Sequence, residues 1–221
     1  MFFILRDAKQ KRKPVPNTAY NGHAQQKLVT PYMRDRWHAL KIMENINEIL
    51  SLDSKENTSH FNKGDILQRE GENCSKVFFV KKGLLRSYTI DDKGKEHIFM
   101  FAPESWVIAD IESHQFNQPA KLFIDCIEES EVIILDRSLL INAELNMDQL
   151  KKNVSLLSRR LAVLQRRVIL LMSASAKERY ELFLETYPKI PNRVPQRMIA
   201  SYLGITPQAL STIRGEITRK K

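Results

Sequence analysis

The chain of 221 residues has few of the residues that build disulfide frameworks, metal clusters or membrane spans. Its only two cysteines, Cys74 and Cys126, lie far apart, which fits reduced thiols better than a disulfide framework. Two cysteines are also too few for a four-cysteine iron–sulfur cluster. No apolar run reaches the length of a membrane span, and the apolar residues 1–5 are too short for a signal peptide. These absences predict a cytoplasmic chain that does not enter a membrane.

Patterns that mark catalytic and metal sites are also missing. The five histidines never fall at the spacing of a ligand pair on one strand or helix, and the His-x-His signature of cupin enzymes is absent. No phosphate loop or nucleophile–base motif is present. We therefore predict no enzymatic activity, no metal and no cofactor. A cupin-type enzyme is the alternative, which metal analysis of the purified protein would test.

Charge is abundant but unevenly distributed. The chain has a net charge of +9. Residues 147–221 contain 15 Lys and Arg against 5 Asp and Glu, whereas residues 37–146 contain 12 against 19 and residues 1–36 contain 8 against 2. A basic C-terminal module beside an acidic middle segment is typical of a DNA-binding domain attached to a separate domain.

The segment 196–214 has the pattern of a helix-turn-helix. Gly204 can supply the positive φ of a tight turn, Thr206 can cap a second helix, and Pro207 suits its first position. The apolar residues of the two helices fall on faces that can pack together: Ile199, Ala200, Leu203, Ile205, Leu210 and Ile213. The alternative is an ordinary helical hairpin, because small helix pairs with a glycine turn are common.

If the motif binds DNA, its polar positions are the candidate contacts. Gln208 can pair with adenine in a bidentate way, Ser211 and Thr212 can reach bases or phosphates, and Arg214 can reach guanine or phosphate. Arg197 and the basic residues 219–221 are candidate phosphate neighbours. The full set of candidate contacts on double-stranded DNA is Gln208, Ser211, Thr212, Arg214, Arg197 and Thr206.

A heptad pattern precedes this motif. Apolar residues recur at alternating spacings of four and three over about three heptads: Leu150, Val154, Leu157, Leu161, Leu164, Val168 and Leu171. Such a stripe is typical of a two-stranded coiled coil and predicts a homodimer. The alternative is that the stripe packs only on its own domain. Residues 173–176 interrupt the stripe as a hinge, and a further helix is expected over 177–186.

Between residues 60 and 136 the pattern changes to short strands with turns near 63–64, 81–83 and 91–94. Strands are expected over 105–111, 121–127 and 131–135, with 114–119 as a loop that would close over a ligand. This spacing predicts a barrel or a double-sheet jelly roll. We therefore expect an α+β chain with a poorly ordered extension at 1–30, a jelly-roll (double-stranded β-helix) domain at 31–146 beginning with a helical lead-in at 31–50, a dimerisation helix at 147–173, and a helix-turn-helix domain at 174–221.

This order of domains, over residues 35–219, resembles the Crp/Fnr family of bacterial transcription regulators. The resemblance is most specific in three segments: Phe61-Asn-Lys-Gly-Asp-Ile-Leu-Gln-Arg-Glu-Gly-Glu72, Val77-Phe-Phe-Val-Lys-Lys-Gly83 and Asp92-Lys-Gly-Lys-Glu96. It implies a β-roll like that of cyclic-nucleotide-binding domains, a winged helix-turn-helix, and a homodimer that reads a pseudo-palindromic operator. Contact with RNA polymerase is a further expectation, as is a ligand in the β-roll that reorients the DNA-binding domains.

The chain departs from the family where cyclic AMP binds. Members that bind it have a Gly-Glu-Leu segment and a later Arg-Ser or Arg-Thr pair, but the corresponding segments here, 106–111 and 119–121, lack the Gly-Glu and the Arg. Trp106 and Lys121 are the remaining pocket candidates, and a lysine is a weak substitute for the arginine. We expect an effector other than cyclic AMP. The alternative function is a small-molecule sensor or interaction module with weak DNA affinity.

Overall fold

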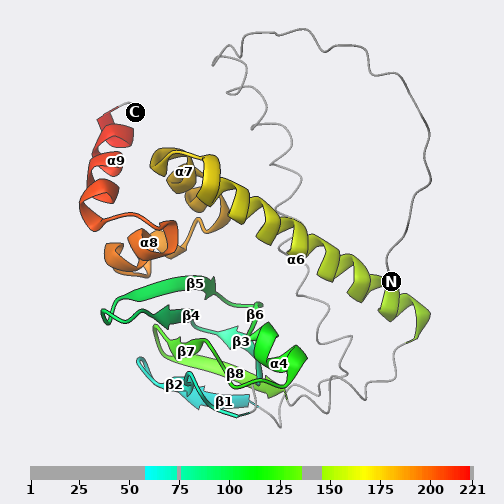
Figure 1. Cartoon of the computed structure of the whole chain (residues 1–221). Helices are drawn as coiled ribbons and strands as arrows, with labels where there is room; N and C mark the ends of the chain where they lie inside the picture. The colour runs from blue at the N-terminus through cyan, green and yellow to red at the C-terminus, as the bar shows by residue number, and fades with distance from the viewer. Residues whose placement is uncertain (1–57, 74–75, 136–145, 220–221) are drawn as a thin grey trace, which may run out of the picture. The chain divides into compact units, whose positions relative to one another are not determined.

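The computed structural model describes residues 58–73, 76–135 and 146–219 (Figure 1). All of them belong to one compact unit, Trp37–Lys221. The extension expected at 1–30 and the lead-in helix expected at 31–50 lie outside the described residues.

In the described residues, eight antiparallel strands form two four-stranded sheets. One sheet has the order β1-β8-β3-β6 and the other the order β2-β7-β4-β5. The strands are β1 (Thr58–Phe61), β2 (Ile66–Gln68), β3 (Val77–Lys82), β4 (Leu85–Ile90), β5 (Glu96–Ala102), β6 (Val107–Ala109), β7 (Phe123–Cys126) and β8 (Ser130–Leu135). The jelly roll predicted from the strand spacing is confirmed.

Alternation along the strands separates two apolar cores. Leu85 of β4 and Ile124 of β7 pack with Phe78 and Val132 of the other sheet and so fill the space between the sheets. Tyr88, three residues after Leu85, belongs to a different cluster, because successive side chains of a strand point to opposite faces. The second sheet therefore has apolar side chains on both faces.

The corner between β3 and β4 requires glycine. Gly83 has a φ of +97°, and a Cβ added there would lie 2.3 Å from Oγ of Ser130 and 2.6 Å from the carbonyl oxygen of Glu129. Only a residue without a side chain permits this approach of the backbone to β8. The chain can thus pass from one sheet to the other directly beside the start of β8.

The segment after β6 differs from the strand and loop expected there. Strand β6 covers only Val107–Ala109, and residues Ile111–Phe116 form helix α4. The Asp110 carboxylate accepts a hydrogen bond from the Ser113 N–H and begins the helix, and Asn117 ends it with a φ of 54°. Local capping therefore overrides the apolar pattern of 105–111, and the expected loop at 114–119 is partly helical.

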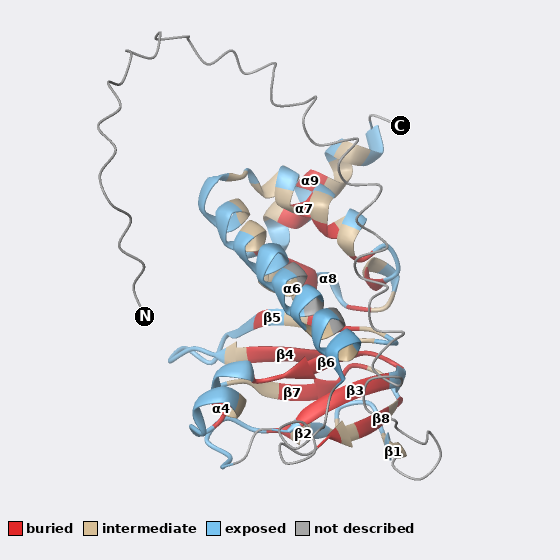
Figure 2. Cartoon of the chain, turned by 90° about the vertical axis from the view of Figure 1, so that its right-hand side faces the viewer, coloured by how far each residue is buried: buried red, intermediate tan, exposed pale blue. Residues whose placement is uncertain are grey.

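The elements after residue 146 are helices, and most of α6 is exposed (Figure 2). They are α6 (Met147–Ser173), α7 (Ala176–Thr186), the short 3-10 helix η3 (Ile190–Asn192), α8 (Gln196–Leu203) and α9 (Pro207–Arg219). Capping boxes at Asn146 and Ser175 begin α6 and α7. Among the described residues from 174 to 219 there is no strand, so the wing expected for this domain is not seen in that stretch.

One apolar cluster joins these helices to the outer face of the second sheet. Phe101 of β5 packs against Phe183, Tyr187 and Tyr202, with ring centroids 5.6–6.2 Å apart. Tyr88, Ile98 and Ile127 of the jelly roll belong to the same cluster as the buried residues of α7, α8 and α9. The helical head, defined here as residues 176–219, is therefore held to the jelly roll by a continuous apolar core.

Candidate nucleic-acid interface

Helices α8 and α9 form a helix-turn-helix whose turn is built as the sequence predicts. Gly204 ends α8 with a φ of +67°, and its N–H donates back to the carbonyls of Ala200 and Ser201. Helix α9 begins at Pro207, and the Thr206 hydroxyl caps it by accepting the Ala209 N–H at 3.2 Å. Ile199, Ala200, Leu203, Leu210 and Ile213 are buried and Ile205 is half-buried, so the predicted inward faces are confirmed.

The polar residues of the motif lie on its outer side. Gln208, Ser211 and Thr212 are exposed on α9, while Arg214 is half-buried at the flank of the same face. The Thr212 hydroxyl donates to the Gln208 carbonyl at 3.2 Å and is therefore engaged within the helix. Arg197 is exposed in the first turn of α8, and Thr206, whose hydroxyl is the cap, is exposed at the turn.

Helix α8 covers the free edge of strand β5. The Ser201 hydroxyl accepts the Ile98 N–H at 2.9 Å and donates to the Glu96 carbonyl at 2.7 Å, so one side chain satisfies two backbone groups of the edge. Arg167 of α6 donates to the carbonyls of Phe99 and Ile98, and its guanidinium lies 4.2 Å from the centre of the Tyr202 ring. The edge of the sheet is thus occupied by side chains from α6 and α8.

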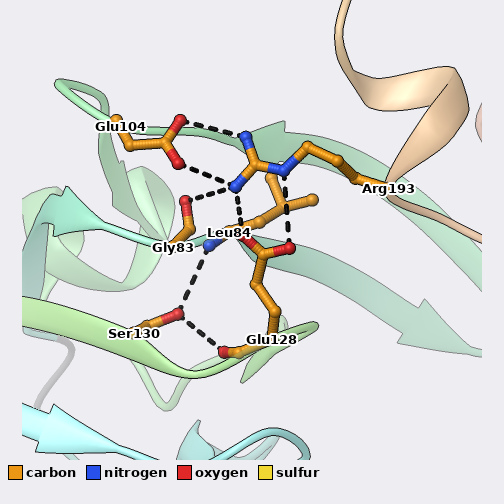
Figure 3. Close-up of polar contacts among 6 residues, drawn as sticks. All are labelled: Gly83, Leu84, Glu104, Glu128, Ser130 and Arg193. Atoms are coloured by element: carbon orange, nitrogen blue, oxygen red, sulfur yellow. Dashed lines mark hydrogen bonds and ion pairs between the residues drawn. The ribbon is translucent and has the colours of Figure 1, made fainter.

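Arg193, between η3 and α8, joins the head to the jelly roll at a second point (Figure 3). Its guanidinium donates to both carboxylate oxygens of Glu104 at 3.0 and 2.8 Å, to the Gly83 carbonyl at 3.0 Å, and to Glu128. Figure 3 shows these groups converging on one side chain, and we name the set Arg193, Gly83, Glu104 and Glu128 the Arg193 clamp. The head is therefore fixed by charge-assisted hydrogen bonds as well as by its apolar core.

The pKa values in the clamp favour the charged forms. Burial alone would lower the pKa of Arg193, but hydrogen bonds to Glu128 and Glu104 outweigh it and the pKa is raised. Burial alone would raise the pKa of Glu104, but the hydrogen bond from Arg193 outweighs it and the pKa is lowered. Both groups are therefore ionised across the physiological range.

The apolar stripe of α6 faces solvent along its length. Every one of the seven predicted stripe residues is exposed, with Leu157 and Leu161 at 64% and 68%. Water-exposed apolar side chains at heptad spacing on a helix of 27 residues form a seam that none of the other described residues covers.

The segment between β6 and β7 is closed by its own side chains. The buried Asp110 carboxylate accepts the N–H groups of Ser113, Lys121 and Leu122 at 3.1, 2.7 and 2.9 Å. The Lys121 ammonium lies 2.5 Å from Glu112, and this hydrogen bond is the main cause of its raised pKa. The amides and the ammonium of this segment are therefore already paired with carboxylates.

Trp106, the other pocket candidate, lies at the junction between domains. Its ring centroid is 5.7 Å from that of Tyr187, which follows α7, and it also packs against the cores on both faces of the first sheet. The structure thus does not pair it with Lys121, whose described contacts are with Glu112 and Asp110.

A buried arginine in β4 was not found by the sequence patterns. Arg86 donates to both oxygens of Asp125 at 2.8 Å and to Glu96 at 2.5 and 3.2 Å. Burial alone would lower its pKa, but the bonds to Asp125 and Glu96 raise it. Its charge is balanced by two carboxylates and so is not free to hold an anion.

Neither a membrane-spanning helix nor a metal cluster is found where the structure describes the chain. No described helix is long and apolar enough to cross a bilayer. Within residues 58–73, 76–135 and 146–219, no group of three or more His, Cys, Asp or Glu side chains is arranged to hold a metal ion.

A jelly roll joined through a long helix to a helix-turn-helix head is the architecture of a DNA-binding transcription regulator, and similarities to known proteins agree. Residues 58–143 match the cyclic nucleotide-binding domain family. Electron transport regulator A of Shewanella oneidensis is 26% identical over 191 residues, which are 79% of this chain and 74% of that protein. Together these similarities support a transcription regulator of the Crp/Fnr type.

Solved structures of other proteins share this fold. FixK2 from Bradyrhizobium japonicum has a TM-score of 0.63 at 23% identity, covering 74% of this chain and 84% of that one. TTHA1359, a Crp/Fnr-family regulator from Thermus thermophilus, has a TM-score of 0.59 at 19% identity, covering 74% and 86%. At these identities the likeness shows a shared fold and nothing more specific.

Proposed function

We propose that this regulator binds DNA as a homodimer and that α9 enters the major groove in each half of a pseudo-palindromic operator. The observation that supports this most directly is the two-sided character of α9. Leu210 and Ile213 are buried, while Gln208 and Ser211 are exposed on the opposite side. The basic segment 147–221 supplies a sequence-independent attraction to phosphates.

Each polar residue has a role that its placement suggests. Gln208, in the first turn of α9, pairs with adenine through its amide, and Ser211 contacts a base edge one turn later. The Thr212 hydroxyl is held by the Gln208 carbonyl, so we assign Thr212 a packing contact against DNA. Arg214 at the flank and Arg197 on α8 contact phosphates, and Thr206 contributes as the cap that fixes the start of α9.

Mobility shifts test this proposal, using the full chain and a duplex whose site comes from genome-wide capture of bound DNA. We expect Gln208→Ala to lose about 1–3 kcal/mol of discrimination at one base position. Arg197→Ala should weaken binding to all sequences and make the salt dependence shallower by about one unit of slope. Lys93→Ala, in the exposed turn between β4 and β5, is the matched control. If neither variant differs from the control, α9 is not the recognition helix.

The exposed stripe of α6 supports the proposed homodimer. Burying seven leucine and valine side chains that are roughly half exposed stabilises a dimer by about 1 kcal/mol each, on the scale of 1.5–3 kcal/mol for full burial. A second copy offers an identical stripe, and two-fold symmetry then matches the two half-sites. Sedimentation of the full chain at micromolar concentration should give a dimer, and a monomer would contradict the proposal.

The effector we propose is not cyclic AMP. The segments at 106–111 and 119–121 lack the Gly-Glu and Arg used for it, Asp110 already accepts the N–H groups of Lys121 and Leu122, and Arg86 is engaged by two carboxylates. Isothermal titration of the full chain with cyclic AMP should show no saturable binding, whereas micromolar binding would refute this part.

The regulator would act in the cytoplasm, where it meets promoter DNA and RNA polymerase. If the full chain binds no captured site and no promoter fragment more tightly than random duplex, the alternative is supported: a small-molecule sensor or interaction module with weak DNA affinity. The same mobility shifts therefore decide between the two functions.

A further inference from the structure

Gly215 has no explanation within the fold. It lies in the ninth of the 13 positions of α9, where glycine is the poorest helix former after proline. A Cβ built on it meets no heavy atom within 4 Å, so no neighbouring group requires the missing side chain. It is also not among the glycines with positive φ, so the backbone does not require glycine either.

Its place on the helix connects it with the DNA-facing side. Residues three, four and seven positions apart share a face of an α-helix, and Gly215 stands seven after Gln208 and four after Ser211. The buried side of α9 is formed by Leu210 and Ile213, away from this face. Thr212, three positions before Gly215, lies on the same face of α9. Its hydroxyl is held against its own helix by the hydrogen bond that it donates to the Gln208 carbonyl.

We propose that Gly215 is the point of closest approach between α9 and DNA, and that its missing side chain lets the third turn of the helix pass against the sugar–phosphate wall of the major groove. This inference rests on the proposed function. An α-helix fits the major groove closely, and a side chain at that point must be accommodated by moving the helix outward. Outward movement would draw the side chains of Gln208 and Ser211 away from the base edges, so Gly215 is a positioning residue for sequence recognition.

The test uses opposite effects on stability and on binding. Gly215→Ala restores a good helix former in open space, so its Tm should rise by roughly 2–4 °C. Its affinity for the captured operator duplex should nevertheless fall about tenfold, which corresponds to about 1.4 kcal/mol. Gly215→Leu, also a good helix former but larger, should bind more weakly still. Neither change alters a charge, so the slope of affinity against salt should equal that of the wild type.

Ser155→Ala on α6 is the matched control, because it also places alanine at an exposed helical position but lies outside the seven-residue stripe. It should leave operator affinity within twofold of the wild type. If both Gly215 variants bind the operator as tightly as this control while Gln208→Ala binds more weakly, this inference is wrong and the proposed function stands. If the wild type itself does not bind the captured site, the proposed function fails first.

Discussion

Replacing Arg193 by methionine should separate the contribution of the Arg193 clamp from that of the apolar core beneath it. Methionine retains most of the aliphatic length but removes every hydrogen bond to Glu104, Glu128 and the Gly83 carbonyl. The Arg193 side chain is 19% exposed, while those of Glu104 and Glu128 are 44% and 36% exposed. The clamp is therefore neither a surface pair nor a fully buried one.

The magnitude follows from that intermediate exposure. Breaking a buried ion pair costs about 3–5 kcal/mol and losing an exposed one about 0–1 kcal/mol. We expect the free energy of unfolding to fall by about 2 kcal/mol in Arg193→Met. For a chain of this size that corresponds to a decrease in Tm of roughly 4–8 °C. Arg197→Met, in the exposed first turn of α8, is the matched control and should change the Tm by about 1 °C or less.

The pH dependence of the Tm gives a second test of the Arg193 clamp. The pKa of Glu104 is lowered from its ordinary value of 4.5, so its contribution to stability is fully present above that value and is lost as the pH falls through the folded-state pKa. The difference in Tm between wild type and Arg193→Met should therefore be largest near neutral pH and shrink below pH 4.5. A difference that equals that of Arg197→Met, or that does not change with pH, would refute the reasoning.

Three further changes test other parts of the molecule. Leu161→Lys should give a monomer in sedimentation, because it puts a charge in the middle of the stripe. Val163→Lys, at an exposed position off the stripe, should leave the dimer intact, and equal behaviour of the two variants would argue against the seam. Asp110→Ala should lower the free energy of unfolding in urea by about 3 kcal/mol, because three backbone N–H groups lose their acceptor. Asp92→Ala in an exposed turn is the control, and an equal midpoint of urea unfolding for both variants would count against the role of the Asp110 carboxylate. Burial raises the pKa of the Cys126 thiol to about 11, so peptide mapping should find it alkylated at pH 8 only after unfolding; rapid alkylation of the folded chain would contradict this.

Local signals predicted the head and the long helix well because their causes are local. The turn at Gly204 and the cap at Thr206 each depend on residues within four positions along the chain. Helix α6 ends at Ser173, where the sequence loses its apolar stripe. Helix α4 was missed although its cause is also local, since the apolar residues around Asp110 suggested a strand and concealed the cap.

The contacts between the head and the jelly roll could not be predicted, because they join residues far apart in sequence. Arg193 meets Glu104 across 89 positions, and Ser201 meets the Glu96 carbonyl across 105. Hydrophobic periodicity and local motifs do not indicate pairs of residues so far apart in the sequence. Arg193 and Arg167 are counted in the basic C-terminal segment, but the structure uses both within the chain. The separation of charge along the sequence therefore also stabilises the chain itself, because the basic head and the acidic jelly roll attract each other, as Arg193 and Glu104 do.

Helix α8 protects the edge of β5 from water and from other molecules for as long as the head stays in place. Ser201 and Arg167 satisfy backbone groups of β5, which among the described strands has no neighbour on that side. If the head swings away, Ile98 N–H and the Glu96 carbonyl face water, and an uncovered edge is a template for pairing with a strand of another molecule. A regulator built this way is most prone to aggregate while its head is released, so the side chains that orient the head also protect the solubility of the sensor domain.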